Sequence, residues 1–147
     1  MTSVTARVPA KINLQLAVGP LRGDGYHGLV TVFHAVSLFD EVTVAAAKAD
    51  GVTVAGEGAG HVPADGDNLA LRAVRALREA IAARDGAPPD AGPDAHAGVA
   101  VAIRKRIPVA GGLAGGSADA AAALVACNEL WQAGLSRSEE RRVGKEC

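Results

Sequence analysis

The stretch PVAGGLAGGSADAAA, at residues 108–122, holds four glycines within six residues, followed by a serine, an aspartate and a run of alanines. The segment before it alternates like a strand, and the segment after it is alanine-rich like a helix. Glycine allows backbone N–H groups to approach a ligand closely, and a helix N-terminus adds unpaired N–H groups at the positive end of its dipole. This order of strand, glycine loop and helix predicts a phosphate-binding site.

Two polar residues that follow the loop each admit two roles. Ser117 could simply cap the helix, which is worth about 1 kcal/mol, or its hydroxyl could bind phosphate or a phosphate-bound metal ion. Asp119 could complement the helix dipole, whereas beside a triphosphate it would repel the ligand unless magnesium lay nearby. The loop is neither a Walker A motif, because Gly116 stands where the lysine belongs, nor the dinucleotide pattern GxGxxG. The loop taken alone is therefore also compatible with a flexible connector that binds no ligand.

The composition describes a small globular protein with an aliphatic core. Of 147 residues, 49% are hydrophobic but only 3% are aromatic, and the net charge is −1. This balance suggests no nucleic-acid partner and no membrane-surface partner. No apolar run is long enough to span a bilayer, the N-terminus lacks a secretory signal, and the two cysteines form no CxxC pair. We expect one domain or a large part of one, in the cytoplasm.

Apolar periodicity predicts a mixture of strands and helices without regular alternation, which favours the α+β class over a doubly wound sheet. One helix is predicted over 67–86, capped by Asp67 or Asn68, and another over 117–134, in which Cys127 packs in the core. The apolar stripes run through Leu71, Val74, Leu77 and Ile81 in the first helix and through Ala120, Leu124, Cys127 and Trp131 in the second. Strands are predicted at 3–8, 11–18, 29–38, 41–47, 51–56 and 99–107, with loops at 19–28 and 87–98.

The last eleven residues, RSEERRVGKEC, differ in character from the rest of the chain. They are almost entirely charged and show no apolar periodicity. An exposed, charged helix end is one interpretation. We favour another, in which residues 137–147 are a non-native tail that arose by sequencing-adapter read-through. The predicted domain then covers residues 1–136 and is incomplete.

Three stretches together resemble the GHMP kinases: PAKINLQLAV, DGYHGLVTVF and IPVAGGLAGGSADAAAAL, in the family's order and spacing. The resemblance covers residues 4–136. It implies the family's N-terminal ATP-binding domain, which is similar to ribosomal-protein domains and has a mixed or antiparallel sheet with helices packed on it. It also implies an enzyme, an ATP-dependent small-molecule kinase that uses Mg²⁺.

The resemblance assigns roles to individual residues. Lys11 matches the active-site lysine, and Asn13, on the same strand face, would hydrogen-bond to the substrate. Tyr26 and His27 match a cytidine-binding stretch, and Phe33 would line the cytidine pocket unless it belongs to the core. Asn68 would lie near the adenine or simply cap a helix, while His34, His61 and His96 are assigned as surface or structural residues. Ser117 would also meet Mg²⁺, as one of the predicted ATP-binding residues Pro108, Val109, Ala110, Gly111, Gly112, Leu113, Ala114, Gly115, Gly116, Ser117 and Ala118.

Within the family, PAKINL together with DGYH resembles the members that phosphorylate the 2-hydroxyl of a cytidine-diphosphate-linked methylerythritol in non-mevalonate isoprenoid biosynthesis. One alternative is a family member that acts on homoserine, mevalonate or a sugar. Another is a non-enzymatic module that binds an anion or RNA, against which the mildly acidic charge counts. The expected partner is therefore a small molecule, with no nucleic acid and no membrane, and the oligomeric state is open.

Two departures from the family pattern modify these expectations. The family often has glycine where Ala110 and Ala114 stand, so we expect negative φ at both alanines or a different loop geometry. The family's catalytic aspartate lies in a GxDVP-like motif, and a further glycine-rich motif follows it; neither occurs in this sequence. We therefore expect residues 1–147 alone to have little or no kinase activity.

Overall fold

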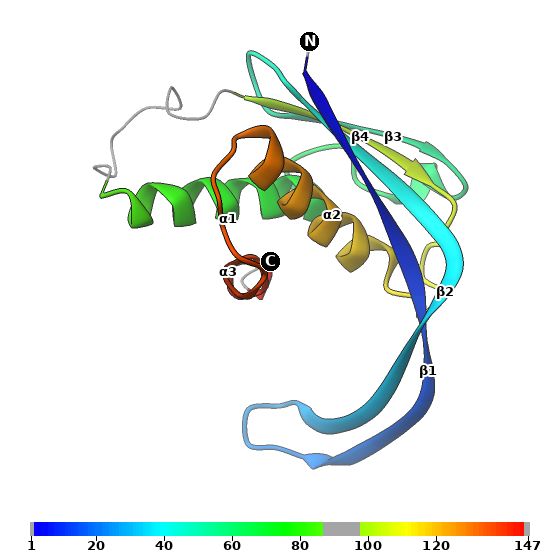
Figure 1. Cartoon of the computed structure of the whole chain (residues 1–147). Helices are drawn as coiled ribbons and strands as arrows, with labels where there is room; N and C mark the ends of the chain where they lie inside the picture. The colour runs from blue at the N-terminus through cyan, green and yellow to red at the C-terminus, as the bar shows by residue number, and fades with distance from the viewer. Residues whose placement is uncertain (1, 87–97, 146–147) are drawn as a thin grey trace.

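The computed structural model describes residues 2–86 and 98–145, where one sheet carries helices on one side (Figure 1). The strand order is β1-β2-β4-β3. β1 pairs with β2 and β2 with β4 in antiparallel fashion, whereas β3 and β4 are parallel, so the sheet is mixed and the α+β prediction is confirmed. The elements are β1 (Ser3–Leu21), β2 (His27–Ala46), β3 (Gly51–Gly56), η1 (Ala59–His61), α1 (Leu69–Arg84), β4 (Val99–Lys105), α2 (Gly115–Leu130) and α3 (Arg137–Val143).

The first two strands are longer than the sequence predicts. Pro9 does not break β1, because the register shifts between Pro9 and Ala10 and a bulge accommodates the missing N–H group. Likewise, β2 runs through Phe39, which pairs with Pro9. The predicted loop at 19–28 contracts to a short turn, because Leu21 still pairs with His27.

The first predicted helix is confirmed, whereas the second helix begins earlier in the sequence than predicted. Asn68 caps α1, since its Oδ1 accepts a hydrogen bond from the Ala70 N–H at 2.9 Å. The second helix, α2, begins at Gly115 rather than at Ser117, because the carbonyl of Ala114 already accepts the N–H of Ala118 at 2.9 Å. The prediction that Ser117 caps this helix is therefore wrong. Ser117 is instead a residue of the first turn of α2.

The core lies between the helices and the part of the sheet that they cover. The residues of both predicted stripes lie in this core, and only Trp131 among them is no more than partly buried. Burial raises the pKa of the Cys127 thiol to about 12, which fits the predicted packing role. Most of the predicted connection at 87–98, with His96, lies outside the described residues. The sheet contributes Val42, Val44, Val99, Val101 and Ile103 to the core.

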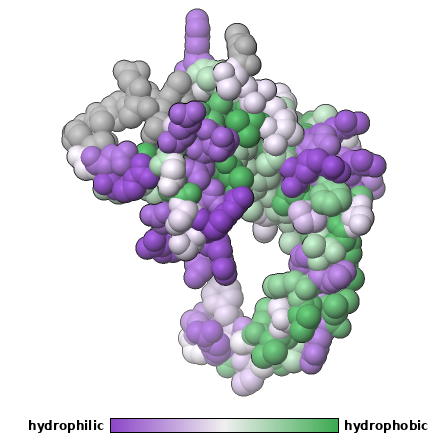
Figure 2. All heavy atoms as spheres, viewed as in Figure 1, coloured by the Kyte–Doolittle hydropathy of each residue, from purple (hydrophilic) through white to green (hydrophobic). Residues whose placement is uncertain are grey.

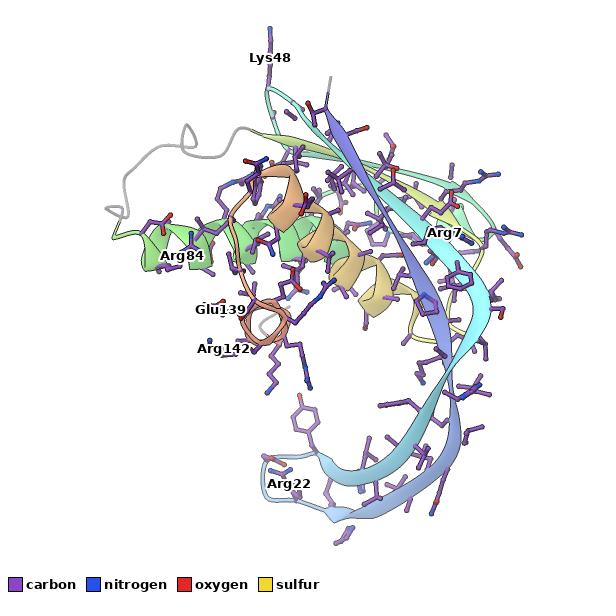
Figure 3. The ribbon with its side chains drawn as sticks, viewed as in Figure 1. Arg7, Arg22, Lys48, Arg84, Glu139 and Arg142 are labelled. Atoms are coloured by element: carbon purple, nitrogen blue, oxygen red, sulfur yellow. The ribbon has the colours of Figure 1, made fainter. Side chains whose placement is uncertain are left out.

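The far halves of β1 and β2 project beyond the helices as a curved hairpin (Figure 1), which we call the arm, residues 14–33. Arg22 marks its far end in Figure 3. Large apolar side chains cover the arm in Figure 2 and are 50–69% exposed. A patch of this kind is typical of an interaction or ligand surface. Its members include Leu14, Leu16, Val18, Leu21, Leu29, Val30, Val32 and Phe33.

The charged end of the chain forms a helix in the structure. Ser136 and Glu139 make a reciprocal capping box, and the buried Glu140 accepts a hydrogen bond from Asn128 Nδ2 at 2.8 Å. Glu140 and Val143 are the buried residues of α3, whereas most of its other residues are exposed. The interpretation of residues 137–147 as non-native stays a prediction, because capping signals stabilise a short helix whatever the origin of the sequence.

Among the described residues, no helix combines the length and the apolar character that crossing a bilayer requires.

Two leucine substitutions test the boundary between core and arm. Leu77 is fully buried in α1, whereas Leu14 is 62% exposed on the arm. We expect Leu77→Ala to lower the free energy of unfolding by about 2–5 kcal/mol, because it leaves a cavity in the core. Leu14→Ala should change it by less than about 0.5 kcal/mol. Urea unfolding followed by circular dichroism measures both, and equal losses would contradict the exposure of the arm.

Candidate active site

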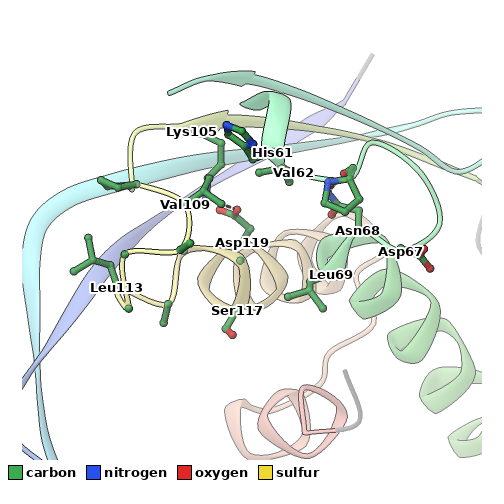
Figure 4. Close-up of a pocket in the computed structure, with 18 residues that line it drawn as sticks. His61, Val62, Asp67, Asn68, Leu69, Lys105, Val109, Leu113, Ser117 and Asp119 are labelled. Atoms are coloured by element: carbon green, nitrogen blue, oxygen red, sulfur yellow. Dashed lines mark hydrogen bonds and ion pairs between the residues drawn. The ribbon is translucent and has the colours of Figure 1, made fainter. Parts of the chain in front are cut away.

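The glycine loop, residues 106–114, connects β4 to α2 and forms one wall of a cavity of about 430 Å³ (Figure 4). The opposite wall comes from the segment before α1, through His61, Val62 and Asn68, and from Leu69 at the start of α1. The predicted nucleotide residues from Pro108 to Ser117 all line this cavity, whereas Ala118 does not. A cavity of this volume matches the size of a small-molecule site.

The loop backbone alternates in handedness. Ala110, Gly112 and Ala114 have φ angles of 61°, 68° and 60°, whereas the residues between them have negative φ. Negative φ at the two alanines, the first of the two expected alternatives, is therefore excluded, and the left-handed conformation costs about 1–2 kcal/mol at each alanine. The alternation is typical of a backbone nest, in which successive N–H groups point toward one bound anion. The loop geometry is thus compatible with a bound anion, and it carries local strain at both alanines.

Lys11 contacts this loop from the first strand. Its Nζ donates to the carbonyl oxygen of Gly112 at 2.7 Å and to Asn13 Oδ1 at 2.8 Å, and its backbone N–H donates to the Leu113 carbonyl at 3.2 Å. The ammonium also lies 5.4 Å from the centre of the Phe33 ring, which is 62% exposed and so does not belong to the core. The structure therefore brings Lys11, Asn13, Phe33 and the loop together, across 101 residues of sequence.

Tyr26 and His27 lie elsewhere, at the far end of the arm. Tyr26 is 73% exposed, and its carbonyl accepts the Arg22 N–H at 2.7 Å. The His27 Nδ1 lies 2.8 Å from the carbonyl oxygen of Gly19. Roughly 30 Å of strand separates this turn from Lys11 along the hairpin. Neither residue lines the cavity at the glycine loop.

A buried ion cluster that the sequence does not reveal lies beneath the loop. The Lys105 ammonium contacts Asp40 Oδ2 and, at 2.7 Å, Asp119 Oδ2. All three residues are at most 3% exposed. Asp40 Oδ1 accepts the backbone N–H groups of Arg106 at 2.6 Å and Ile107 at 2.9 Å. We call Lys105, Asp40 and Asp119 the buried ion cluster.

The two carboxyl groups of this cluster have opposite pKa shifts. Burial acts to raise the pKa of Asp40, but the two backbone N–H groups and Lys105 outweigh it, so the pKa falls below its ordinary value. Burial raises the pKa of Asp119 to about 6, with Lys105 opposing and Asp40 reinforcing the shift. Burial would lower the pKa of Lys105, yet both carboxylates together raise it. Asp119 Oδ1 is buried without a hydrogen-bond partner.

One signal in the sequence could have located this cluster. In β4 every second residue is buried, so the pattern that points Val101 and Ile103 inward also points Lys105 inward. A buried ammonium requires acidic partners. Asp119 stands close by in the sequence, but Asp40, 65 residues away, follows only from the tertiary fold.

Metal ligands are sparse at this site. Among residues 2–86 and 98–145, no group of three or more His, Cys, Asp or Glu side chains could hold a metal ion. Ser117 is exposed at the edge of the cavity. Asp119 is the carboxylate of α2 that is nearest to Ser117 in the sequence, but its Oδ2 already accepts a hydrogen bond from Lys105.

Two neighbouring residues of β4 provide a matched test of the cluster. Lys105→Met leaves two carboxyl groups buried without their cation, so we expect the free energy of unfolding at pH 7.5 to fall by about 3–5 kcal/mol. Arg104→Met is the control, because the Arg104 side chain is 75% exposed and should change stability by less than about 0.5 kcal/mol. Urea unfolding measures both. A similar small effect for the two variants would show that Lys105 is not a buried partner of the carboxylates.

Comparisons with known proteins identify the family. Residues 68–147 match the GHMP kinases N terminal domain. The chain is 57% identical over 138 residues to the 4-diphosphocytidyl-2-C-methyl-D-erythritol kinase of Saccharopolyspora erythraea, covering 94% of this chain and 41% of that protein. It is 58% identical over 139 residues to the kinase of the same name from Streptomyces coelicolor, covering 93% and 42%.

Solved structures show the same fold. A crystal structure of 4-(cytidine 5'-diphospho)-2C-methyl-D-erythritol kinase is 36% identical with a TM-score of 0.66, covering 95% of this chain and 45% of that one. A homoserine kinase from Cytophaga hutchinsonii, 19% identical with a TM-score of 0.62, covers 98% and 40% and shares the fold. The chain spans about two fifths of the length of the curated relatives it matches. This chain belongs to the GHMP kinases.

Proposed function

We propose that the protein is an ATP-dependent kinase that phosphorylates the 2-hydroxyl of 4-diphosphocytidyl-2-C-methyl-D-erythritol, a step of non-mevalonate isoprenoid synthesis in the cytoplasm. The observation that carries the proposal is the contact of the Lys11 ammonium with the Gly112 carbonyl of the loop. It puts a cation beside an anion-binding nest, as phosphoryl transfer requires. The names of the relatives, at 57–58% identity, support the substrate.

The cavity at the loop is the proposed ATP site. The nest and the N-terminus of α2 would hold the triphosphate through backbone N–H groups, without a Walker lysine. Apolar side chains of Val62, Leu69 and Val109 would contact the adenine. Asn68 acts indirectly, because its Oδ1 caps α1 and its Nδ2 donates to the Pro63 carbonyl at 2.6 Å. It thereby fixes the wall that faces the loop.

The proposed Mg²⁺ fits this site only as an ion that arrives with the nucleotide. Magnesium is commonly bound by one or two protein groups together with substrate phosphates. The exposed Ser117 hydroxyl can supply one such oxygen. When bound, the ion would neutralise phosphate charge.

Lys11 is the proposed catalytic residue. Its ammonium can stabilise charge on the transferring phosphoryl group and lower the pKa of the attacking hydroxyl. Asn13, which accepts a hydrogen bond from Lys11 and donates through Nδ2 to Thr31 Oγ1 at 2.6 Å, would orient the lysine and meet the substrate. Positioning and charge stabilisation would then supply most of the rate enhancement.

The arm is the proposed cytidine site. The exposed Tyr26 ring offers a face on which a base can stack, and His27 offers a polar edge. Phe33, beside Lys11, would line the path between the base and the reacting hydroxyl. Homoserine, mevalonate and a simple sugar have no base to stack, so a role for Tyr26 favours the cytidine substrate over these alternatives.

Substitution of Lys11 tests the catalytic proposal. In this chain extended to the length of its relatives, we expect Lys11→Ala to lower kcat for ATP-dependent phosphorylation of the cytidyl substrate by about 100- to 1000-fold, because transition-state charge loses its cation. Lys48→Ala, which removes an exposed lysine far from the loop (Figure 3), should leave kcat unchanged. Similar kcat values for Lys11→Ala and the unsubstituted enzyme would exclude the proposed role.

Substitution of Tyr26 tests the cytidine site. Loss of base stacking typically costs about 1–3 kcal/mol, so Tyr26→Ala should weaken CDP binding by about 5- to 150-fold. Tyr26→Phe keeps the ring and should bind CDP nearly as well as the unsubstituted protein. Calorimetric titration with CDP measures the difference, with ATP affinity as the control. Displacement of CDP by homoserine or mevalonate would instead favour another GHMP kinase activity.

A further inference from the structure

Side chains of β1 and β2 form a series of hydrogen bonds that leads from the arm to the glycine loop. The Thr31 hydroxyl donates to the Gln15 carbonyl oxygen at 2.8 Å and accepts from Asn13 Nδ2 at 2.6 Å. Asn13 Oδ1 accepts from Lys11 Nζ at 2.8 Å, and the same ammonium donates to the Gly112 carbonyl oxygen at 2.7 Å. Thr31 belongs to the arm, so the series connects the arm to the loop.

The chemistry of the groups fixes the direction of each bond in this series. A hydroxyl has one proton, and Thr31 donates its proton to the Gln15 carbonyl, which can only accept. Thr31 Oγ1 therefore offers only lone pairs to Asn13, so the amide turns its NH₂ group toward Thr31. The amide oxygen then faces Lys11, whose ammonium can only donate.

The opposite orientation of the Asn13 amide would disrupt this arrangement. The NH₂ group would then face the Lys11 ammonium, as two donors without an acceptor between them. The amide oxygen would face Thr31 Oγ1, whose proton is bonded to another oxygen. Asn13 is exposed, so packing contributes little to holding its side chain. The hydrogen bonds therefore hold the amide in one orientation.

The hairpin backbone brings Thr31 and Asn13 within reach of each other. Asn13 pairs with Phe33, and Thr31 stands two residues before Phe33 on β2, so the three side chains lie on one face. The register of the two strands shifts between Asn13 and Gln15, and a bulge of this kind re-aims the side chains beside it. Thr31 is β-branched, which restricts the rotation of its hydroxyl about χ1. Thr31 is therefore a stiff support for a flexible amide.

We infer that Thr31 is a positioning residue of the proposed phosphoryl transfer: it keeps the Asn13 amide oxygen facing Lys11 while the ammonium exchanges the loop carbonyl for a phosphate. The inference rests on the proposed function. During that exchange the amide oxygen is the acceptor that stays in place, and Thr31 is what keeps it there when the ammonium moves. No covalent bond changes along the series, and each group keeps its own protons.

Three substitutions test the inference. Thr31→Val keeps the shape and the β-branching of the side chain but can neither donate nor accept, whereas Thr31→Ser keeps the hydroxyl. Thr5→Val is the matched control, because Thr5 Oγ1 lies 2.8 Å from Thr43 Oγ1 in another exposed pair across the same two strands. Valine suits a strand as well as threonine does, so both valine variants should fold.

NMR of residues 1–147 measures the orientation of the amide without any reaction. In the unsubstituted protein and in Thr31→Ser, we expect a nuclear Overhauser effect between the Asn13 Nδ2 protons and the β protons of residue 31, because Nδ2 lies 2.6 Å from the hydroxyl oxygen. The effect should weaken in Thr31→Val, where the amide is released, and stay unchanged in Thr5→Val. An undiminished effect in Thr31→Val would overturn the inference.

Kinetics of the chain extended to the length of its relatives measure the consequence for the reaction. Thr31→Val should lower kcat for phosphorylation of the cytidyl substrate by about 3- to 10-fold, which corresponds to the loss of one hydrogen bond, and leave KM for ATP unchanged. Thr31→Ser should restore kcat, and Thr5→Val should not change it. In an Asn13→Ala background, Thr31→Val should lower kcat no further, because Thr31 acts through Asn13.

The outcomes separate this inference from the proposed function. Equal kcat values for the unsubstituted extended chain and Thr31→Val overturn the inference and leave the function standing, and so do additive losses for Thr31→Val and Asn13→Ala. An unsubstituted extended chain that does not phosphorylate the cytidyl substrate contradicts the proposed function. A weakened Overhauser effect in Thr31→Val would then still support the role of Thr31 in holding the amide, and an undiminished effect would overturn it.

Discussion

The glycine loop depends on one buried ammonium. Lys105 is shared by Asp40 on β2 and Asp119 on α2, and all three are nearly inaccessible to water. Removing such charges from water is costly, and the cost is offset only when each charge has close partners. Asp40 meets this condition with backbone N–H groups of the residues that lead into the loop. A change in the loop conformation would therefore remove hydrogen-bond partners from the buried carboxylate, and loss of that carboxylate would release the loop backbone.

This dependence explains why strained alanines persist in the loop. Ala110 and Ala114 adopt left-handed conformations that favour glycine, and such strain survives only where the surroundings over-determine the backbone. The cluster holds the loop from below, while β1 holds it from the side through the Lys11 N–H and Nζ contacts. The two lysines differ in one respect. Lys11 can exchange a neutral carbonyl partner for a phosphate, whereas Lys105 cannot leave without stranding two carboxyl groups. The geometry thus favours Lys11 as the lysine that meets a substrate.

Local features of this structure could be predicted from the sequence, and non-local ones could not. The cap at Asn68 and the stripe of α1 depend on neighbours within a few residues, so both predictions are confirmed. The continuity of β1 through Pro9 depends on a bulge against β2, and the partner of Lys105 at Asp40 depends on strand pairing across the sheet. Contact of Lys11 with the loop followed from resemblance to a family, not from spacing. Helix propensity disfavours the start of α2 at Gly115, because glycine destabilises a helix, whereas in the structure Asp119 of the same helix is held by Lys105.

The length of the arm restricts which molecules can contact both of its ends. Tyr26 and Lys11 lie on the same hairpin but at opposite ends of its exposed part, which bends toward the side of the sheet that carries the helices (Figure 1). A molecule that stacks on Tyr26 and presents a hydroxyl near Lys11 must be extended, with an aromatic group at one end and an alcohol at the other. A cytidine diphosphate joined to a polyol has this form, and a small alcohol does not. The apolar residues between the two ends are exposed, and in the proposed reaction water at the transferring phosphoryl group would compete with the alcohol, so a cover over the arm would favour phosphoryl transfer to the alcohol. Under the proposed function, covering this one surface would serve both base recognition at Tyr26 and exclusion of water at Lys11.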